Sequence, residues 1–133
     1  MREKELRLAL VCYGGISLAV YMHGITKEIW NAARASRAHQ DKGMALSPCA
    51  DVYRQLIADI EESAATRLRV FIDIIAGASA GGINGVFLAQ AITSGQSLDP
   101  LTDLWLTKAD VDELLDPDAR PLSGLTKFWA VPI

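Results

Sequence analysis

Two apolar segments, residues 6–13 (LRLALVCY) and residues 70–76 (VFIDIIA), have the length and composition of buried β-strands. Both end at glycine, and the second is rich in β-branched residues, which favour strands. Near-continuous apolar runs are typical of parallel strands covered on both faces. We therefore expect two parallel strands in the core. The core side chains expected in the strands and in the helix that follows the second are Leu8, Leu10, Val70, Ile72, Ile74, Ile75 and Val86.

After the first strand the apolar positions change period and recur every three or four residues, as on one face of a helix. The first helix is expected from Ser17 to about Arg37. Ser47-Pro48 places an N-cap residue before a proline at the first helical position, so a second helix should begin there. The order of strand, helix, helix, strand and helix indicates an α/β layered fold.

The third predicted helix, residues 83–92, is apolar nearly all round, which predicts a buried central helix that ends at Gly95. Asp99-Pro100 should begin a short helix through about Leu106. Residues 109–115 are expected to add one more helical turn.

The chain has 133 residues, half of them hydrophobic, and a formal net charge of −3. This length suits one globular domain. The absence of a basic stripe argues against nucleic-acid binding.

Cys12 and Cys49 form no CxxC pair and predict neither a metal site nor a disulfide. No cofactor is therefore expected, and a reducing cytoplasm is the default location. Gly14-Gly15 interrupts the apolar residues 8–22, which argues against a signal peptide.

The most informative motif is Gly77-x-Ser79-x-Gly81, followed by Gly82. A serine on a sharp strand-to-helix turn is held with its hydroxyl exposed, and glycines two residues before and after allow close backbone contact. The strand before the motif and the apolar helix after it provide this context. Ser79 is therefore the predicted nucleophile. The spacing fits neither a dinucleotide fingerprint nor a P-loop.

A second glycine turn, Tyr13-Gly14-Gly15-Ile16, follows the first strand. Backbone N–H groups of Gly14, Gly15 and Ile16, together with that of Ala80 behind the nucleophile, are the candidate oxyanion donors. A plain strand-to-helix turn would have the same sequence.

Together, residues 7–19 (RLALVCYGGISLA) and residues 73–85 (DIIAGASAGGING) resemble the patatin-like phospholipase family, in its bacterial patatin-related branch. The first motif departs from the family pattern of three glycines and a basic residue, because Tyr13 precedes the glycine pair and Ser17 stands near the basic position. The resemblance implies a three-layer α/β/α fold with a mainly parallel sheet. It also implies a lipid acyl hydrolase, of phospholipase A or lysophospholipase type, that forms an acyl-Ser79 intermediate.

Such enzymes use an Asp from an Asp-Gly pair as the general base, and no Asp of this chain is followed by Gly. Asp73 lies within the strand, and His23 precedes Ser79 and is best explained as a surface or packing histidine. We therefore expect residues 1–133 to be the N-terminal part of one catalytic domain, inactive alone and with an exposed or self-associating apolar face. Peripheral membrane contact is a further expectation. An acyltransferase with the same elbow and a non-catalytic anion- or partner-binding module are the alternatives.

Overall fold

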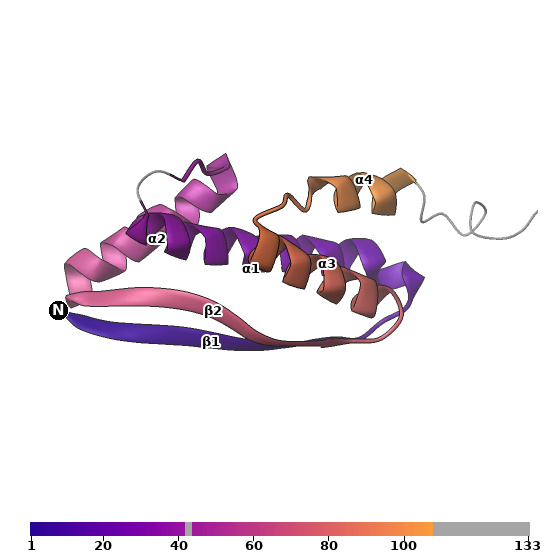
Figure 1. The fold of residues 1–133 in the computed structure, drawn as a ribbon, viewed down its shortest axis with the longest axis horizontal. Coiled ribbons are helices and arrows are strands. Elements are labelled where there is room, and N and C mark those ends of the chain that lie inside the picture. The colour runs from indigo at the N-terminus through magenta and orange to yellow at the C-terminus, as the bar shows by residue number, and fades with distance from the viewer. Residues whose placement is uncertain (42–43, 108–133) are drawn as a thin grey trace, which may run out of the picture.

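The structure is a computed structural model that describes residues 1–41 and 44–107. The expected turn at residues 109–115 lies outside the described residues. The elements and their order confirm the predicted α/β pattern (Figure 1). They are β1 (Arg2–Cys12), the short 3-10 helix η1 (Ile16–Leu18), α1 (Ala19–Gln40), α2 (Pro48–Ala64), β2 (Thr66–Gly77), α3 (Ala80–Ser94) and α4 (Asp99–Thr107).

The two strands pair in parallel, from Arg2 opposite Thr66 to Cys12 opposite Gly77. Both begin several residues earlier than predicted, because the charged N-terminal residues of β1 also pair along β2. The register shifts once, after Leu8, where Asp73 is the extra residue of β2. A bulge of this kind bends a strand and changes its pairing register. Beyond it, the two carboxyl ends lie level, which brings the two glycine turns together.

Helix boundaries follow the signals in the sequence closely. Ser47 caps α2, its Oγ accepting a hydrogen bond from Ala50 N at 3.3 Å, and Pro48 is the first helical residue. Gly95 ends α3 with φ of 75°, a left-handed conformation that glycine adopts at little cost. α1 runs three residues further than expected, to Gln40.

The four α-helices of residues 1–41 and 44–107 lie on the same side of the two strands (Figure 1). The outer edge of β2 is partly covered by α1, because Val70 N donates a hydrogen bond of 2.9 Å to Ser36 Oγ. The core has two clusters. One lies at the glycine-turn end and contains Ala19, Met22, Ala80, Leu101 and Trp105, and the other contains Trp30, Leu88, Ala91 and Leu98.

The prediction of strands buried on both faces is wrong for the described part of the chain. Ile74 is 60% exposed and Val86 is 66% exposed, whereas the other residues expected in the core are half-buried. Ile75 packs against the helices, so its neighbour Ile74 points to the side of the sheet that no described helix covers. Val86 lies on a flank of α3 that meets neither α1 nor the sheet. Both side chains are therefore among the exposed large apolar residues of the described chain.

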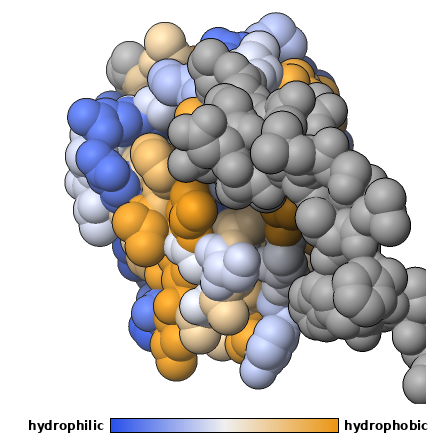
Figure 2. All heavy atoms as spheres, turned by 90° about the vertical axis from the view of Figure 1, so that its right-hand side faces the viewer, coloured by the Kyte–Doolittle hydropathy of each residue, from blue (hydrophilic) through white to orange (hydrophobic). Residues whose placement is uncertain are grey.

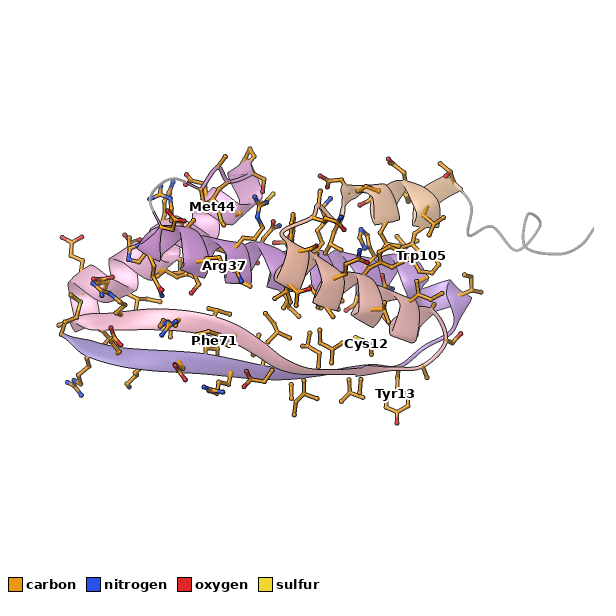
Figure 3. The ribbon with its side chains drawn as sticks, in the orientation of Figure 1. Cys12, Tyr13, Arg37, Met44, Phe71 and Trp105 are labelled. Atoms are coloured by element: carbon orange, nitrogen blue, oxygen red, sulfur yellow. The ribbon has the colours of Figure 1, made fainter. Side chains whose placement is uncertain are left out.

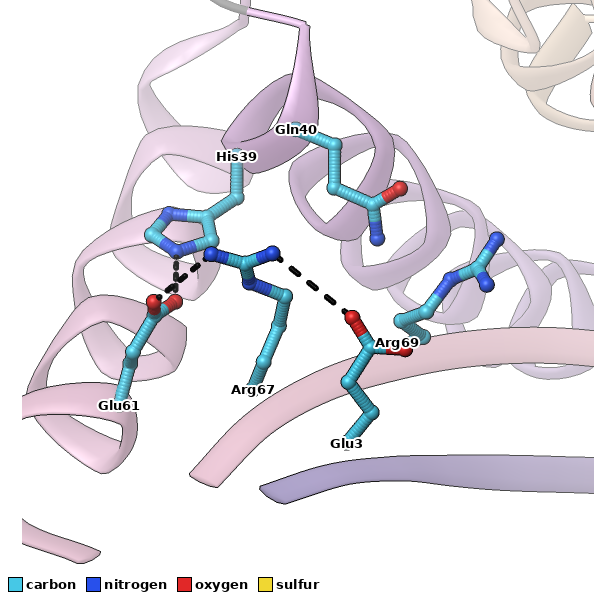
Figure 4. A pocket seen from close by; sticks show the side chains of 6 residues that line it. All are labelled: Glu3, His39, Gln40, Glu61, Arg67 and Arg69. Carbon is cyan, nitrogen blue, oxygen red and sulfur yellow. Dashed lines mark hydrogen bonds and ion pairs between the residues drawn. The ribbon is translucent and has the colours of Figure 1, made fainter. Parts of the chain in front are cut away.

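A polar network closes the opposite end of the sheet (Figure 4). His39 Nε2 lies 2.7 Å from Glu61 Oε2, and Arg67 pairs with Glu61 at 3.3 Å and with Glu3 at 3.7 Å. These residues line a cavity of about 500 Å³. The network joins the ends of α1 and α2 to both strands, far from the glycine turns.

Candidate active site

Ser79 occupies the turn between β2 and α3, as predicted, since β2 ends at Gly77 and α3 begins at Ala80. Its backbone has φ of 55° and ψ of −132°. A residue with a Cβ rarely adopts this conformation, which costs about 1–3 kcal/mol and persists only where the surrounding structure imposes it. This strained serine has the backbone geometry of a nucleophile elbow.

The flanking glycines are required by close backbone contacts. A Cβ on Gly81 would lie 2.1 Å from Cys12 O, and a Cβ on Gly77 would lie 2.7 Å from Gly81 O. Gly82 is less constrained, because its Cβ would approach Gly77 O at 3.3 Å. These short distances to backbone atoms support the interpretation that Gly77 and Gly81 permit a tight turn.

The first glycine turn lies directly beside Ser79, as expected for two turns at the carboxyl ends of neighbouring parallel strands. Ala78 N donates to Cys12 O at 3.2 Å, and Gly81 N donates to Gly14 O at 3.4 Å. Gly14 has φ of 145°, a conformation that favours glycine. Figure 3 shows Tyr13 pointing away from the helices and Cys12 toward them.

Two of the proposed oxyanion donors stand at helix starts. Ile16 is the first residue of η1, and Ala80 is the first residue of α3. The first N–H groups of a helix have no partner within it, so both are available to an incoming oxygen atom. Gly14 and Gly15 belong to the same turn as Ile16. The carbonyl oxygen of Gly14 accepts the hydrogen bond from Gly81 N.

Among the residues that the structure describes, no acidic or histidine side chain bonds to Ser79. Asp73 pairs with Arg7 at 3.1 Å, in agreement with the prediction that its carboxylate does not serve Ser79. Asp99 pairs with Lys27 at 2.6 Å, and this bond holds the pKa of the Asp99 carboxyl below its usual range. Asp110, Asp112, Asp116 and Asp118 lie outside the described residues.

His23 is a packing residue, which is one of the two roles, surface or packing, that the sequence favoured. It is 4% exposed, and its Nε2 lies 2.7 Å from Thr102 Oγ1 on α4. Burial lowers the pKa of His23, with a further contribution from the positive charge of Lys27. The neutral ring thus connects α1 to α4.

Asn84 was missed by the sequence analysis, although its segment was quoted. It is fully buried, and its Nδ2 donates to Ala19 O at 3.1 Å while its Oδ1 accepts from Trp105 Nε1 at 2.9 Å. The available signal was an asparagine inside a helix that is otherwise apolar nearly all round. Within residues 1–41 and 44–107, no cluster of His, Cys, Asp and Glu is placed to hold a metal ion.

Comparison with protein families gives a match to the patatin-like phospholipase model over residues 10–130. The chain belongs to the patatin-like phospholipase family. Its α/β fold with a parallel sheet agrees with that family, whose members are lipid acyl hydrolases. The match includes both glycine turns and Ser79.

An uncharacterized membrane protein of Mycobacterium tuberculosis is 36% identical to this patatin-like chain over 132 residues. The alignment covers 92% of the chain but 12% of that relative, so the chain spans about an eighth of the relative's length. No solved structure matches the chain. None of the helices in the described ranges has both the length and the apolar character needed to cross a bilayer.

Proposed function

We propose that this patatin-like chain supplies the nucleophile and oxyanion turn of a serine acyl hydrolase that cleaves lipid acyl esters. The observation that carries the proposal is the strained Ser79, held beside the Gly14 turn by two backbone hydrogen bonds. Ser79 Oγ attacks the ester carbonyl, and the N–H groups of Ile16 and Ala80 stabilise the oxyanion. The alcohol leaves, and water then releases the acid from acyl-Ser79.

The general base in this proposal is an Asp beyond Ile133. A serine hydroxyl is a weak nucleophile at neutral pH unless a base accepts its proton. The carboxylates of Asp73 and Asp99 are both held in ion pairs, so neither is free for this role. An Asp that contacts Ser79 directly would complete a two-residue catalytic dyad.

An apolar cleft beside the oxyanion turn supports a substrate with an acyl chain. A cavity of about 160 Å³ next to Cys12 is lined by residues that include Met22 and Ile25. It shares Ile25 and Ile29 with a second cavity of about 470 Å³ between β1, α1 and α2, which is lined almost wholly by apolar side chains. An acyl chain bound there would run along β1, away from Ser79.

The surface around the turns supports contact with lipid. Tyr13 is 78% exposed, Tyr21 is 70% exposed and Leu18 is 47% exposed. Figure 2 views this end of the molecule and shows hydrophobic residues gathered there beside hydrophilic ones. Exposed aromatic and aliphatic side chains of this kind suit the boundary between lipid and water.

The test uses a fluorophosphonate probe, which forms an adduct with an activated serine, on the longer protein that contains this sequence. We expect labelling in the wild type and in Ser63→Ala, which removes an exposed serine on α2, but none in Ser79→Ala. An adduct that survives Ser79→Ala contradicts the assignment. No labelling at all favours the non-catalytic binding module. Ester formation with an added alcohol would identify an acyltransferase.

Residues 1–133 alone should hydrolyse a p-nitrophenyl ester negligibly. Oxyanion and binding contacts without a catalytic base accelerate reactions roughly 10³–10⁴-fold over water. Typical enzymes begin near ~10⁶-fold. Ser79-dependent turnover at enzyme-like rates by the 133-residue chain would show that it contains its own base.

A further inference from the structure

Asn84 is a polar side chain at the centre of three helices. It lies five residues after Ser79 on α3 and has no exposed surface. Its amide nitrogen donates to the carbonyl oxygen of Ala19, the first residue of α1, and its amide oxygen accepts from the indole N–H of Trp105 on α4. One side chain therefore joins α3 to both α1 and α4.

These bonds are made inside an apolar cluster, where they resist exchange with water. Ala19, Ala80 and Trp105 all belong to that cluster, and Cys12 packs against it. A buried amide that loses its partners carries a desolvation penalty, so the arrangement with both bonds made is strongly preferred. The separation between the start of α1 and the start of α3 is consequently fixed by the Asn84 side chain.

That separation is also the one that matters for catalysis. Ile16 lies three residues before Ala19, and Ser79 directly precedes Ala80. Ile16 belongs to the turn that feeds α1, whereas Ser79 belongs to the turn that feeds α3. Any movement of α1 along α3 would shift the oxyanion donor relative to the nucleophile.

We propose that Asn84 is a positioning residue that fixes the oxyanion turn relative to Ser79, and that Trp105 holds the Asn84 amide in its working orientation. This inference rests on the proposed function and extends it to α4, which contains no reacting group. Loss of one oxyanion donor costs on the order of 10²–10³-fold in kcat. A donor that is displaced but still present should cost less, at about tenfold or more.

The chain contains matched controls for both residues. Asn31 is also buried, at 3% exposed, but among the described residues its amide bonds only to Glu28, at 3.4 Å and on its own helix. Trp30 is 4% exposed, and its indole N–H has no partner within the described part of the chain. Asn31→Leu and Trp30→Phe therefore make the same changes of side-chain volume at buried positions without touching the link between α1 and α3.

The first measurement is steady-state hydrolysis of a p-nitrophenyl ester by the longer protein that contains this sequence. We expect Asn84→Leu and Trp105→Phe to lower kcat at least tenfold with KM within twofold. Asn31→Leu and Trp30→Phe should leave kcat within twofold. The double variant of Asn84 and Trp105 should be no slower than Asn84→Leu, because the two residues act as one unit.

The second measurement does not depend on activity. Hydrogen exchange followed by mass spectrometry should show faster exchange of the backbone amides of residues 14–19 in Asn84→Leu, and unchanged exchange there in Asn31→Leu. If Asn84→Leu does not fold, Trp105→Phe provides the same comparison against Trp30→Phe.

Unchanged exchange at residues 14–19, or a loss of kcat equal to that of the controls, would overturn the proposal. If hydrolysis proves independent of Ser79, the proposed function fails. The exchange experiment still decides whether Asn84 holds the turn.

Discussion

Gly81→Ala tests the closest contact in the site. The new Cβ would lie 2.1 Å from the carbonyl oxygen of Cys12, whereas real Cβ contacts are almost never shorter than 3.0 Å. The end of β1 and the start of α3 would have to separate by roughly 0.9 Å, and both contacting groups are backbone. Inserting extra atoms into a packed core typically lowers the free energy of unfolding by ~1–3 kcal/mol. We expect a loss at the upper end of that range for Gly81→Ala, because both contacting groups are rigid backbone.

The control is Gly24→Ala in α1, where a Cβ would meet nothing within 4 Å. Alanine is favoured over glycine inside a helix by about 0.5–1 kcal/mol, so this variant should be slightly more stable than wild type. Urea unfolding at pH 7, followed by circular dichroism, gives both free energies of unfolding. If the free energy of unfolding of Gly81→Ala lay within about 0.5 kcal/mol of the wild-type value, the contact would be refuted, and with it the placement of the two turns.

Three further predictions concern strain and charge. Ser79→Gly should raise the free energy of unfolding by about 1 kcal/mol in urea, because glycine relieves the positive φ, whereas Ser79→Ala keeps the Cβ and should gain nothing. The melting temperature should fall as the pH is lowered from 7.5 to 5.5, and it should fall less in His23→Gln. Burial lowers the pKa of His23 in the folded protein, so the unfolded chain binds more protons in this range and is favoured as the pH falls. Equal slopes of melting temperature against pH in the two proteins would contradict this. Hydrogen bonds, first from His39 and then from Arg67, lower the pKa of Glu61. Glu61→Gln should therefore destabilise the protein at pH 7, and the loss should shrink as the pH falls below the ordinary value of 4.5 toward pH 3. An equal loss at both pH values would show that the charge of Glu61 is not involved.

Much of this molecule could be predicted from local sequence. The elbow was found because its chemistry is local: Gly77, Ser79 and Gly81 must stand at fixed spacing between a strand and a helix. Helix limits such as Ser47 and Gly95 were also found, because capping depends on a residue and its immediate neighbours.

Burial was predicted less well, because it depends on what packs over each face. Ile74 and Val86 have the apolar character of core residues, but no described helix covers the first and the second lies on a free flank of α3. The β-bulge at Asp73 had no signal in the sequence either, since a register shift becomes defined only when two strands pair.

The sequence by itself determined the place of Ser79 on a strand-to-helix turn, the glycines around it and the order of strands and helices, because each depends on residues adjacent in the chain. Only the tertiary structure decided that Gly14 lies against Gly81, and that Asn84 joins Ala19 to Trp105. These contacts link residues that are from 21 to 67 positions apart in the chain. Pairing over such distances follows from the parallel register and the packing of helices, which no local pattern encodes.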